Sequence, residues 1–450
     1  MFFSLEDTLN QKHPLYILAN KIDWKKFEDN FKVYYCPDNG SPALPIRLLT
    51  GLLLLKHLRN ISDESVVEQW SENIYYQYFC GEKEFRAEEP CEASELVHFR
   101  KRIGEVGIEL ILQESIRING KDRFDGNVSV DTTVQEKNIT FPTDNKLHRK
   151  IIKRCLEITK KEQLPIRQSY KRTLKKLSLD QRFRNHPKNK KKAKKADKRV
   201  KTIAGRLLRE LERNIGINTN YKEEIDIFKK VLSQQKYDKN KIYSLHEPEV
   251  ECISKGKEHK KYEFGNKVSI VLTQTTGVII GAMSFRNEYD GHTLEPALEQ
   301  AERLLGNKKS IKMVIADRGY RGNTKINDIE IKTPKPFSDK TMTKYKQKKL
   351  KDKFGRRAAI EPIIGHLKRD HRLERNFYKG LIGDSINIIL AATAFNFKRM
   401  MRKWKSSFLF YFFKSIFDRI LQENLTLTST KTFSIAFEPN LCIRKQERHL

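Results

Sequence analysis

The sequence predicts an α/β fold, in which a mixed β-sheet flanked by helices follows an all-α N-terminal region. Three observations lead to this prediction. Residues 1–120 carry helical periodicity. Runs rich in β-branched residues then appear, bounded by turn residues. A long, highly charged and mostly helical stretch separates the first of these runs from the others, so we expect a helical insertion within the sheet domain.

The N-terminal region, residues 1–120, contains consecutive helical patterns. ALPIRLLTGLLLLKHLRN and SDESVVEQWSENIYYQYF are separated at residues 60–63, where Ser62 and Asp63 are candidate N-caps. A third helix begins near residue 94 and carries three adjacent basic side chains, Arg100, Lys101 and Arg102. These side chains fit either a helix-turn-helix-like unit that contacts DNA or the exposed face of an ordinary helical bundle.

The sheet is expected to come from residues 121–140 and 261–404. A first strand covers residues 127–134, with Asp131 near its end. KVSIVLTQ and GVIIGAMSF form a hairpin that turns at residues 275–277. A helix follows, with Thr293 as its cap, Pro296 in its first turn and Gly306 as its stop.

The next strand, KMVIAD, ends on Asp317, and IEIKTPKP is the last expected strand. A further amphipathic helix covers residues 383–404, and residues 405–450 form a C-terminal tail.

The stretch at 141–260 is the expected insertion. Its centre has nine Lys or Arg residues between Lys188 and Lys201. We predict that this part contacts DNA phosphates, with Lys191, Lys194 and Lys195 as the candidate residues. The alternative is a solvated face or a disordered arm.

Composition narrows the class of protein. The formal charge of +32 over 450 residues favours a polyanionic partner. Six cysteines are scattered without a C-x-x-C pair, which argues against a zinc site and a disulfide framework. The first residues turn acidic at once, unlike a signal peptide, and SFLFYFF near residue 410 is too short to span a bilayer. We therefore expect a cytoplasmic, nucleoid-associated protein without a membrane partner.

Three acidic residues stand out by their context. Asp131 and Asp317 lie at the ends of strand-like runs, and Glu361 belongs to F-x2-R-x3-E-x6-K, which is Phe354, Arg357, Glu361 and Lys368. On one helix these four positions would lie on one face. Together the carboxylates would make an oxygen-ligand site for hard cations. Taken singly, each aspartate also fits a turn or cap, and the glutamate also fits a solvated ion pair with Arg357.

These motifs resemble those of the DDE transposases of bacterial insertion sequences, whose third motif is Y-x2-R-x3-E-x6-K. Phe354 replaces the tyrosine of that motif. DRGYRG after Asp317, the ALPIRLLTGLLLLKHLRN stretch and EFGNKVSI extend the similarity. The resemblance implies an RNase H-like catalytic core that cuts DNA at the ends of the element and transfers strands into target DNA.

The resemblance also implies a ligand set and partners. Asp131 would bridge two Mg²⁺ ions, with Asp317 and Glu361 each serving one, and Mn²⁺ would substitute. The partners would be double-stranded DNA, as terminal inverted repeats and as target, and a second copy of the chain when bound to DNA ends. Candidate DNA contacts beside the triad are Arg357, Lys368, Arg318 and Arg321. Two other functions fit the same motifs, a structure-selective nuclease with an RNase H-like core and a non-catalytic DNA-binding relic.

Overall fold

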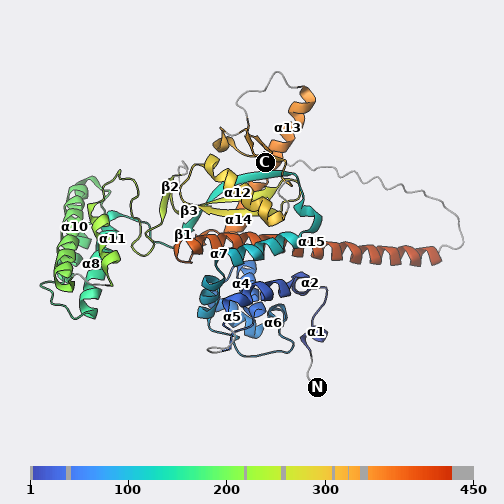
Figure 1. Cartoon of the computed structure of the whole chain (residues 1–450), viewed down its shortest axis with the longest axis horizontal. Helices are drawn as coiled ribbons and strands as arrows, with labels where there is room; N and C mark the ends of the chain where they lie inside the picture. The colour runs from blue at the N-terminus through green and yellow to red at the C-terminus, as the bar shows by residue number, and fades with distance from the viewer. Residues whose placement is uncertain are drawn as a thin grey trace.

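A helical N-terminal region and a mixed β-sheet form the body of the protein, and a helical insertion projects from one side of it (Figure 1). The computed structural model confirms the expected α/β class with an all-α N-terminal part. It describes residues 4–36, 42–216, 220–254, 260–306, 310–322, 324–334 and 343–427, without the side chains of residues 346 and 406–427.

Caps divide the N-terminal region into short helices before one long one. Ser62 accepts a hydrogen bond from the amide of Ser65 at 3.1 Å and starts α5, as predicted. Asn73 caps α6 through the amide of Tyr75 at 3.0 Å, which splits the second helical pattern in two. The helices are α1 (Leu5–Thr8), α2 (Pro14–Lys21), α3 (Trp24–Phe31), α4 (Ile46–Arg59), α5 (Asp63–Glu72), α6 (Ile74–Cys80) and α7 (Ala93–Ile118).

The sheet has the strand order β2-β3-β1-β5-β7-β6, with β4 paired to β3 and β8 paired to β1. Strand β1 pairs antiparallel with β3 and parallel with β5, so the sheet is mixed. The β3–β4 hairpin turns at Gly277, whose φ of +70° suits glycine, and this confirms the predicted hairpin. The strands are β1 (Asn127–Lys137), β2 (Glu251–Ser254), β3 (Tyr262–Thr273), β4 (Ile279–Phe285), β5 (Met313–Ile315), β6 (Lys325–Ile326), β7 (Ile329–Lys332) and β8 (Arg375–Asn376).

Strand β1 is longer than the sequence predicts. It continues to Lys137, so Asp131 lies in the middle of the strand and not near its end. The extension contains polar residues that are nevertheless buried: Gln135 accepts a hydrogen bond from Asn387 at 2.6 Å, and Lys137 is 4% exposed. A pattern search for apolar residues misses such positions because their partners lie far away in the chain.

A buried polar cluster surrounds Lys137 at the end of β1. Its ammonium group donates to Asp384 Oδ1 at 2.6 Å and lies 3.5 Å from Glu247 Oε2. Asn266 of β3 and Asn376 of β8 also donate to the Asp384 carboxylate. Burial raises the pKa of Asp384, although Lys137 acts in the opposite direction. The cluster joins the end of β1, the return of the chain before β2, and α15.

The remaining helices of the body are α12 (Asp290–Leu305), α13 (Lys344–Arg357), α14 (Ile360–Asp370) and α15 (Gly380–Leu427). Helix α12 ends at Gly306 in the left-handed conformation, as predicted, but it begins at Asp290, one turn before the predicted cap Thr293. Thr293 Oγ1 instead donates to the carbonyl of Asp290 inside the first turn.

Helix α15 extends beyond the predicted 383–404 in both directions. Its Gly380–Lys405 part is long and apolar enough to cross a membrane by composition, yet 78% of its most apolar window is buried inside the protein. It packs against α7, α4 and β4, as a core helix does.

Two large sets of buried apolar side chains exist among the described residues, beside a small set formed by Leu5, Leu9 and Tyr16. The first runs without interruption from the N-terminal helices through the sheet to α15. The second belongs to the insertion alone and includes Ile151, Leu207 and Phe228. The insertion helices are α8 (Asp144–Lys161), α9 (Lys171–Asp180), α10 (Pro187–Ile215) and α11 (Lys222–Ser233).

Candidate active site

Strands β1 and β5 bring two of the predicted acidic residues together. They are parallel neighbours, with Ser129 opposite Ile315 at the end of the paired segment. Two residues further along each chain stand Asp131 and Asp317, so continuing the register places them side by side. Neighbouring strands lie about 4.8 Å apart, which puts the two carboxylates within reach of a shared ligand.

Asp131 is half-buried and already faces a cation. Its Oδ1 accepts the amide hydrogen of Thr132 at 2.8 Å, and its Oδ2 lies 3.8 Å from Arg357 Nη1. The Arg357 side chain is only 20% exposed, so the guanidinium reaches into the site from the end of α13. Positive charge is therefore accommodated at Asp131.

Asp317 begins a short 3-10 turn, Arg318–Tyr320, after β5. Its Oδ1 accepts the amide hydrogen of Gly319 at 2.8 Å. Arg318 and Arg321 follow on the surface, where both side chains are exposed. Their exposure beside Asp317 is compatible with the predicted DNA contacts.

A fourth carboxylate, Asp290, was not recognised in the sequence. Its Oδ1 accepts a hydrogen bond from Thr132 Oγ1 at 2.9 Å and lies 3.0 Å from Lys267 Nζ. A Cβ atom built on Gly319 would lie 3.0 Å from Asp317 Oδ1 and 3.2 Å from Asp290 Oδ2. The two carboxylate oxygens are therefore near each other, because their separation cannot exceed the sum of these two distances. Asp290 therefore lies near Asp317 and contacts Thr132, the residue that follows Asp131.

Tyr320 packs beneath these carboxylates. It is 1% exposed, and its pKa is raised well above the ordinary value, first by burial and then by Asp290, Asp131 and Asp317. A neutral phenol suits this place because a negatively charged phenolate would be repelled by the three neighbouring aspartates. The role of Tyr320 is thus to fill the space below the site.

The third motif, which contains Glu361, forms two helices and not the single predicted helix. The chain breaks at residues 358–359, so Phe354 and Arg357 belong to α13, whereas Glu361 and Lys368 belong to α14. The prediction that all four share one helical face is therefore wrong. Glu361 is exposed in the first turn of α14, which packs against β1, and Lys368 is half-buried in the last turn.

The carboxylate groups of this site are of the chemical type that binds a hard cation. Asp131, Asp317 and Asp290 offer only carboxylate oxygens, which Mg²⁺ and Mn²⁺ prefer. Within the described parts of the chain, however, no three His, Cys, Asp or Glu side chains are grouped closely enough to hold one ion. The described carboxylates therefore do not form a complete ligand set by themselves.

Arg100 of the N-terminal region does not fit the predicted DNA contact. It is 5% exposed, and its guanidinium makes two hydrogen bonds to Asp63, at 2.8 and 2.9 Å. It also lies 4.2 Å from the centre of the Tyr378 ring, which ties α7 to the body. Lys101 and Arg102 are exposed, with Arg102 over the Tyr35 ring.

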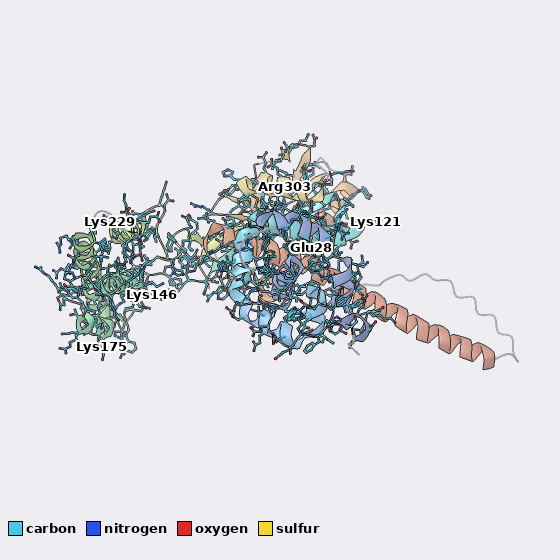
Figure 2. The ribbon with its side chains drawn as sticks, turned by 60° about the horizontal axis from the view of Figure 1, so that its bottom comes forward. Glu28, Lys121, Lys146, Lys175, Lys229 and Arg303 are labelled. Carbon is cyan, nitrogen blue, oxygen red and sulfur yellow. The ribbon has the colours of Figure 1, made fainter. Side chains whose placement is uncertain are left out.

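The predicted lysines of the insertion are on its surface. Lys191, Lys194 and Lys195 are exposed along α10, while the intervening Ala193 and Ala196 are buried. The lysine-rich stretch is thus an ordered amphipathic helix, not a disordered arm. Figure 2 shows the insertion as a lobe set apart from the body, with Lys146, Lys175 and Lys229 on it.

Comparison with known proteins identifies the class. A family model described as Transposase domain (DUF772) matches residues 3–102, and one described as Transposase DDE domain matches residues 232–397. The chain therefore belongs to the DDE transposases of bacterial insertion sequences. This family generally uses divalent metal ions and acts on DNA.

One curated relative is similar to part of this chain. An uncharacterized protein, ORF8 of the nfe locus of Rhizobium meliloti, is 40% identical over 187 residues, which are 40% of this chain and 90% of that protein. No solved structure matches the chain. The DDE match includes Asp317 and Glu361, whereas Asp131 lies outside both matched segments.

Proposed function

We propose that this transposase catalyses metal-dependent cleavage of DNA at the ends of its element and transfer of the cut strand into target DNA, on an RNase H-like core. The observation that supports the proposal is the parallel pairing of β1 with β5, in which Ser129 lies opposite Ile315, two residues before Asp131 and Asp317. In this proposal residues 121–140 and 261–404 form the catalytic domain, residues 1–120 and the insertion contact DNA, and residues 405–450 are an appended tail.

Asp131, Asp317 and Glu361 would hold two Mg²⁺ ions. Bound metal would supply Lewis acidity for the attacking oxygen and for the leaving oxygen of the phosphodiester. Because Glu361 is exposed at the start of α14, we propose that it joins the aspartates when DNA and metal are bound. Arg357, which now lies near Asp131, would then bind a phosphate of the substrate.

Asp290 is a positioning residue in this proposal. Its hydrogen bond to Thr132 and its ion pair with Lys267 fix the backbone that follows Asp131. Asp290→Asn should therefore raise the metal concentration needed for half-maximal cleavage, while unfolding temperature stays near that of the parent. Thr132→Val removes the same link and should show the same shift. If both variants respond to metal like the parent, Asp290 has no part in the site.

The central test uses amides in place of the carboxylates. Asp131→Asn, Asp317→Asn and Glu361→Gln should each slow nicking of duplexes that carry the element ends by at least about a thousandfold, roughly 4 kcal/mol, with DNA binding retained. Glu295→Gln, at an exposed position of α12, is the matched control and should cleave at the parental rate. A triad variant that cleaves in Mg²⁺ near the parental rate removes that residue from the site.

The same assay separates transposition from the other two functions. A transposase joins the cut 3′ end to a second DNA, whereas a structure-selective nuclease nicks without joining, and a non-catalytic relic does neither. In this proposal the substrate ends are terminal inverted repeats on either side of the gene, which sequencing of the flanking DNA would reveal. We further propose that two copies of the chain pair on two DNA ends, which the mass of the DNA complex measures.

A further inference from the structure

A cleft of about 740 Å³ lies where the insertion meets the body. Its walls come from the chain after β1, from α8 and α10, from the return before β2, and from the start of β3. Clefts of roughly 300–1,000 Å³ take ligands with a few ring systems and are too small for a double helix. The cleft is therefore sized for individual bases.

Aromatic rings line one side of the cleft. Phe141 and Tyr262 are 61% and 51% exposed, which is unusual for such large rings at a junction between two lobes. Behind them, Phe264 packs edge-on against Phe141 at 5.4 Å and lies 5.3 Å from Tyr243. Phe264 thus holds the Phe141 ring in place, and the cleft presents the exposed rings of Phe141 and Tyr262.

Basic side chains dominate the other side. Lys198, Lys201 and Lys236 are exposed in the lining. The two acidic residues there already have partners: Asp144 lies 3.8 Å from Lys241, and Asp197 accepts hydrogen bonds from Asn145, Gln181 and Arg184. The surplus charge of the lining is positive, which suits an anionic ligand.

A stripe of lysines leads along α10 into the cleft. Lys191, Lys194, Lys198 and Lys201 follow one face at helical spacing, and the last two belong to the lining. At 1.5 Å per residue the stripe covers about 15 Å. Exposed rings beside a basic track are the features with which proteins bind single-stranded nucleic acid, since bases stack on the rings and phosphates follow the charge.

We propose that this cleft binds unpaired DNA bases by stacking them on Phe141 and Tyr262, with the α10 lysine stripe holding the backbone. The proposal rests on the proposed function, because cutting and joining DNA ends leaves unpaired nucleotides near the reaction. The cleft lies beyond the end of β1, some 20 Å along the strand from Asp131. That distance equals about six base-pair steps.

The test measures affinity of the full chain for a fluorescent single strand of about 20 nucleotides and for a duplex of the same length. The double variant Phe141→Leu, Tyr262→Leu should lose about tenfold or more in affinity for the single strand and stay within about twofold for the duplex. A 2-aminopurine base in the single strand should be quenched by the parent and not by the variant, which reports stacking directly.

Phe183→Leu is the matched control, since this ring is 81% exposed on the insertion outside the cleft lining. It should bind both DNAs like the parent. Single-strand affinity within twofold of the parent in the double variant overturns the proposal. Equal loss for single strand and duplex also overturns it, because the cleft then binds the backbone and not bases.

The catalytic variant keeps this proposal distinct from the proposed function. Asp131→Asn should bind the single strand with parental affinity, because the cleft does not include Asp131. If that variant still cleaves, the proposed function fails while the binding result stands. If the double variant binds unpaired DNA normally while Asp131→Asn is inactive, only the cleft proposal fails. Both altered rings are more than half exposed, so the unfolding temperature should remain parental and confirms that the fold is intact.

Discussion

The two helical regions of this transposase are built in opposite ways. The N-terminal helices share one apolar core with the sheet and α15, whereas the insertion has a core of its own. Polar contacts show the same difference: Lys56 and Arg100 meet Asp63 inside the N-terminal region and lie over the ring of Tyr378, while the insertion carries its ion pairs on the surface. A helical region next to a sheet is therefore not by itself a separate folding unit.

The largest effect is expected from cutting the chain. A fragment of residues 142–247 should unfold cooperatively, because its four helices bury their apolar faces against one another. A fragment of residues 1–120 should show no cooperative transition, because α4 and α7 lose the α15 surface on which they pack. Thermal unfolding followed by circular dichroism measures both. Cooperative unfolding of the N-terminal fragment would show that the shared core is not required.

The second largest effect is expected from breaking a buried ion pair. Burial by itself raises the pKa of Asp63, but Arg100 and Lys56 outweigh it and hold the pKa below its usual range. Asp63→Asn leaves two buried cations without a counter-ion and should lower the free energy of unfolding of the body by about 3–5 kcal/mol. Asp29→Asn, in an exposed pair with Lys32, is the control and should cost under about 1 kcal/mol.

Leu207→Ala is the corresponding change in the insertion, where it should cost about 2–5 kcal/mol. The three tryptophans, Trp24, Trp70 and Trp404, all lie outside the insertion. Their fluorescence therefore follows the body alone, whereas circular dichroism follows both parts. In denaturant, Leu207→Ala should shift part of the unfolding transition that circular dichroism follows. The midpoint that tryptophan fluorescence follows should stay as in the parent. A shift of the fluorescence midpoint would mean that the two cores unfold together.

Lowering the pH should reduce the free energy of unfolding of the body more than that of the insertion. Burial lowers the pKa of His57 and His371 in the body and of His148 in the insertion. Each group is held neutral when folded, so the unfolded chain binds the proton first. Stability is then present above the unfolded pKa of about 6.5 and falls as the pH drops below it, by at most about 1.4 kcal/mol per pH unit for each histidine.

Between pH 7.5 and 5.5 the fluorescence midpoint in urea should fall more steeply than the midpoint of the isolated insertion fragment. His292→Asn changes an exposed histidine and should leave the slope of the body as it is. Equal slopes for the two parts would contradict the assignment of two buried neutral histidines to the body.

The smallest effect concerns salt. Lys191→Gln, Lys194→Gln and Lys195→Gln together should flatten the log–log dependence of DNA affinity on salt by about one unit per lost phosphate contact. Lys101→Gln with Arg102→Gln is the N-terminal comparison and should remove at most two units. Neither set should change the unfolding temperature. An unchanged slope in the triple variant would make the lysine face of α10 a solvated surface.

Local patterns in the sequence predicted the elements well and their contacts less well. The hairpin at Gly277, the cap at Ser62 and the stop at Gly306 depend on nearby residues, and the structure confirms them. Arg100 was assigned to DNA because helical periodicity does not reveal Asp63, which lies 37 residues earlier in the chain. The partner of a charged side chain is a property of the tertiary fold.

The placement of the candidate site residues on the elements was predictable to the same extent. Strand-like runs marked Asp131 and Asp317, and their juxtaposition follows from the parallel pairing of their strands. Asp290 was overlooked because Thr293 was the stronger cap by residue type, so the first turn of α12 was placed too late. The break between α13 and α14 was also missed, since Ala358 and Ala359 are good helix formers.

The cluster around Lys137 has a mechanical consequence. The insertion is joined to the body by two connecting segments. Both segments meet at one buried cluster, where Lys137 binds Asp384 and Glu247. The insertion is therefore fixed to the body at a single place. In the proposed complex with DNA, a force on the insertion is therefore transmitted to the end of β1, the strand that carries Asp131.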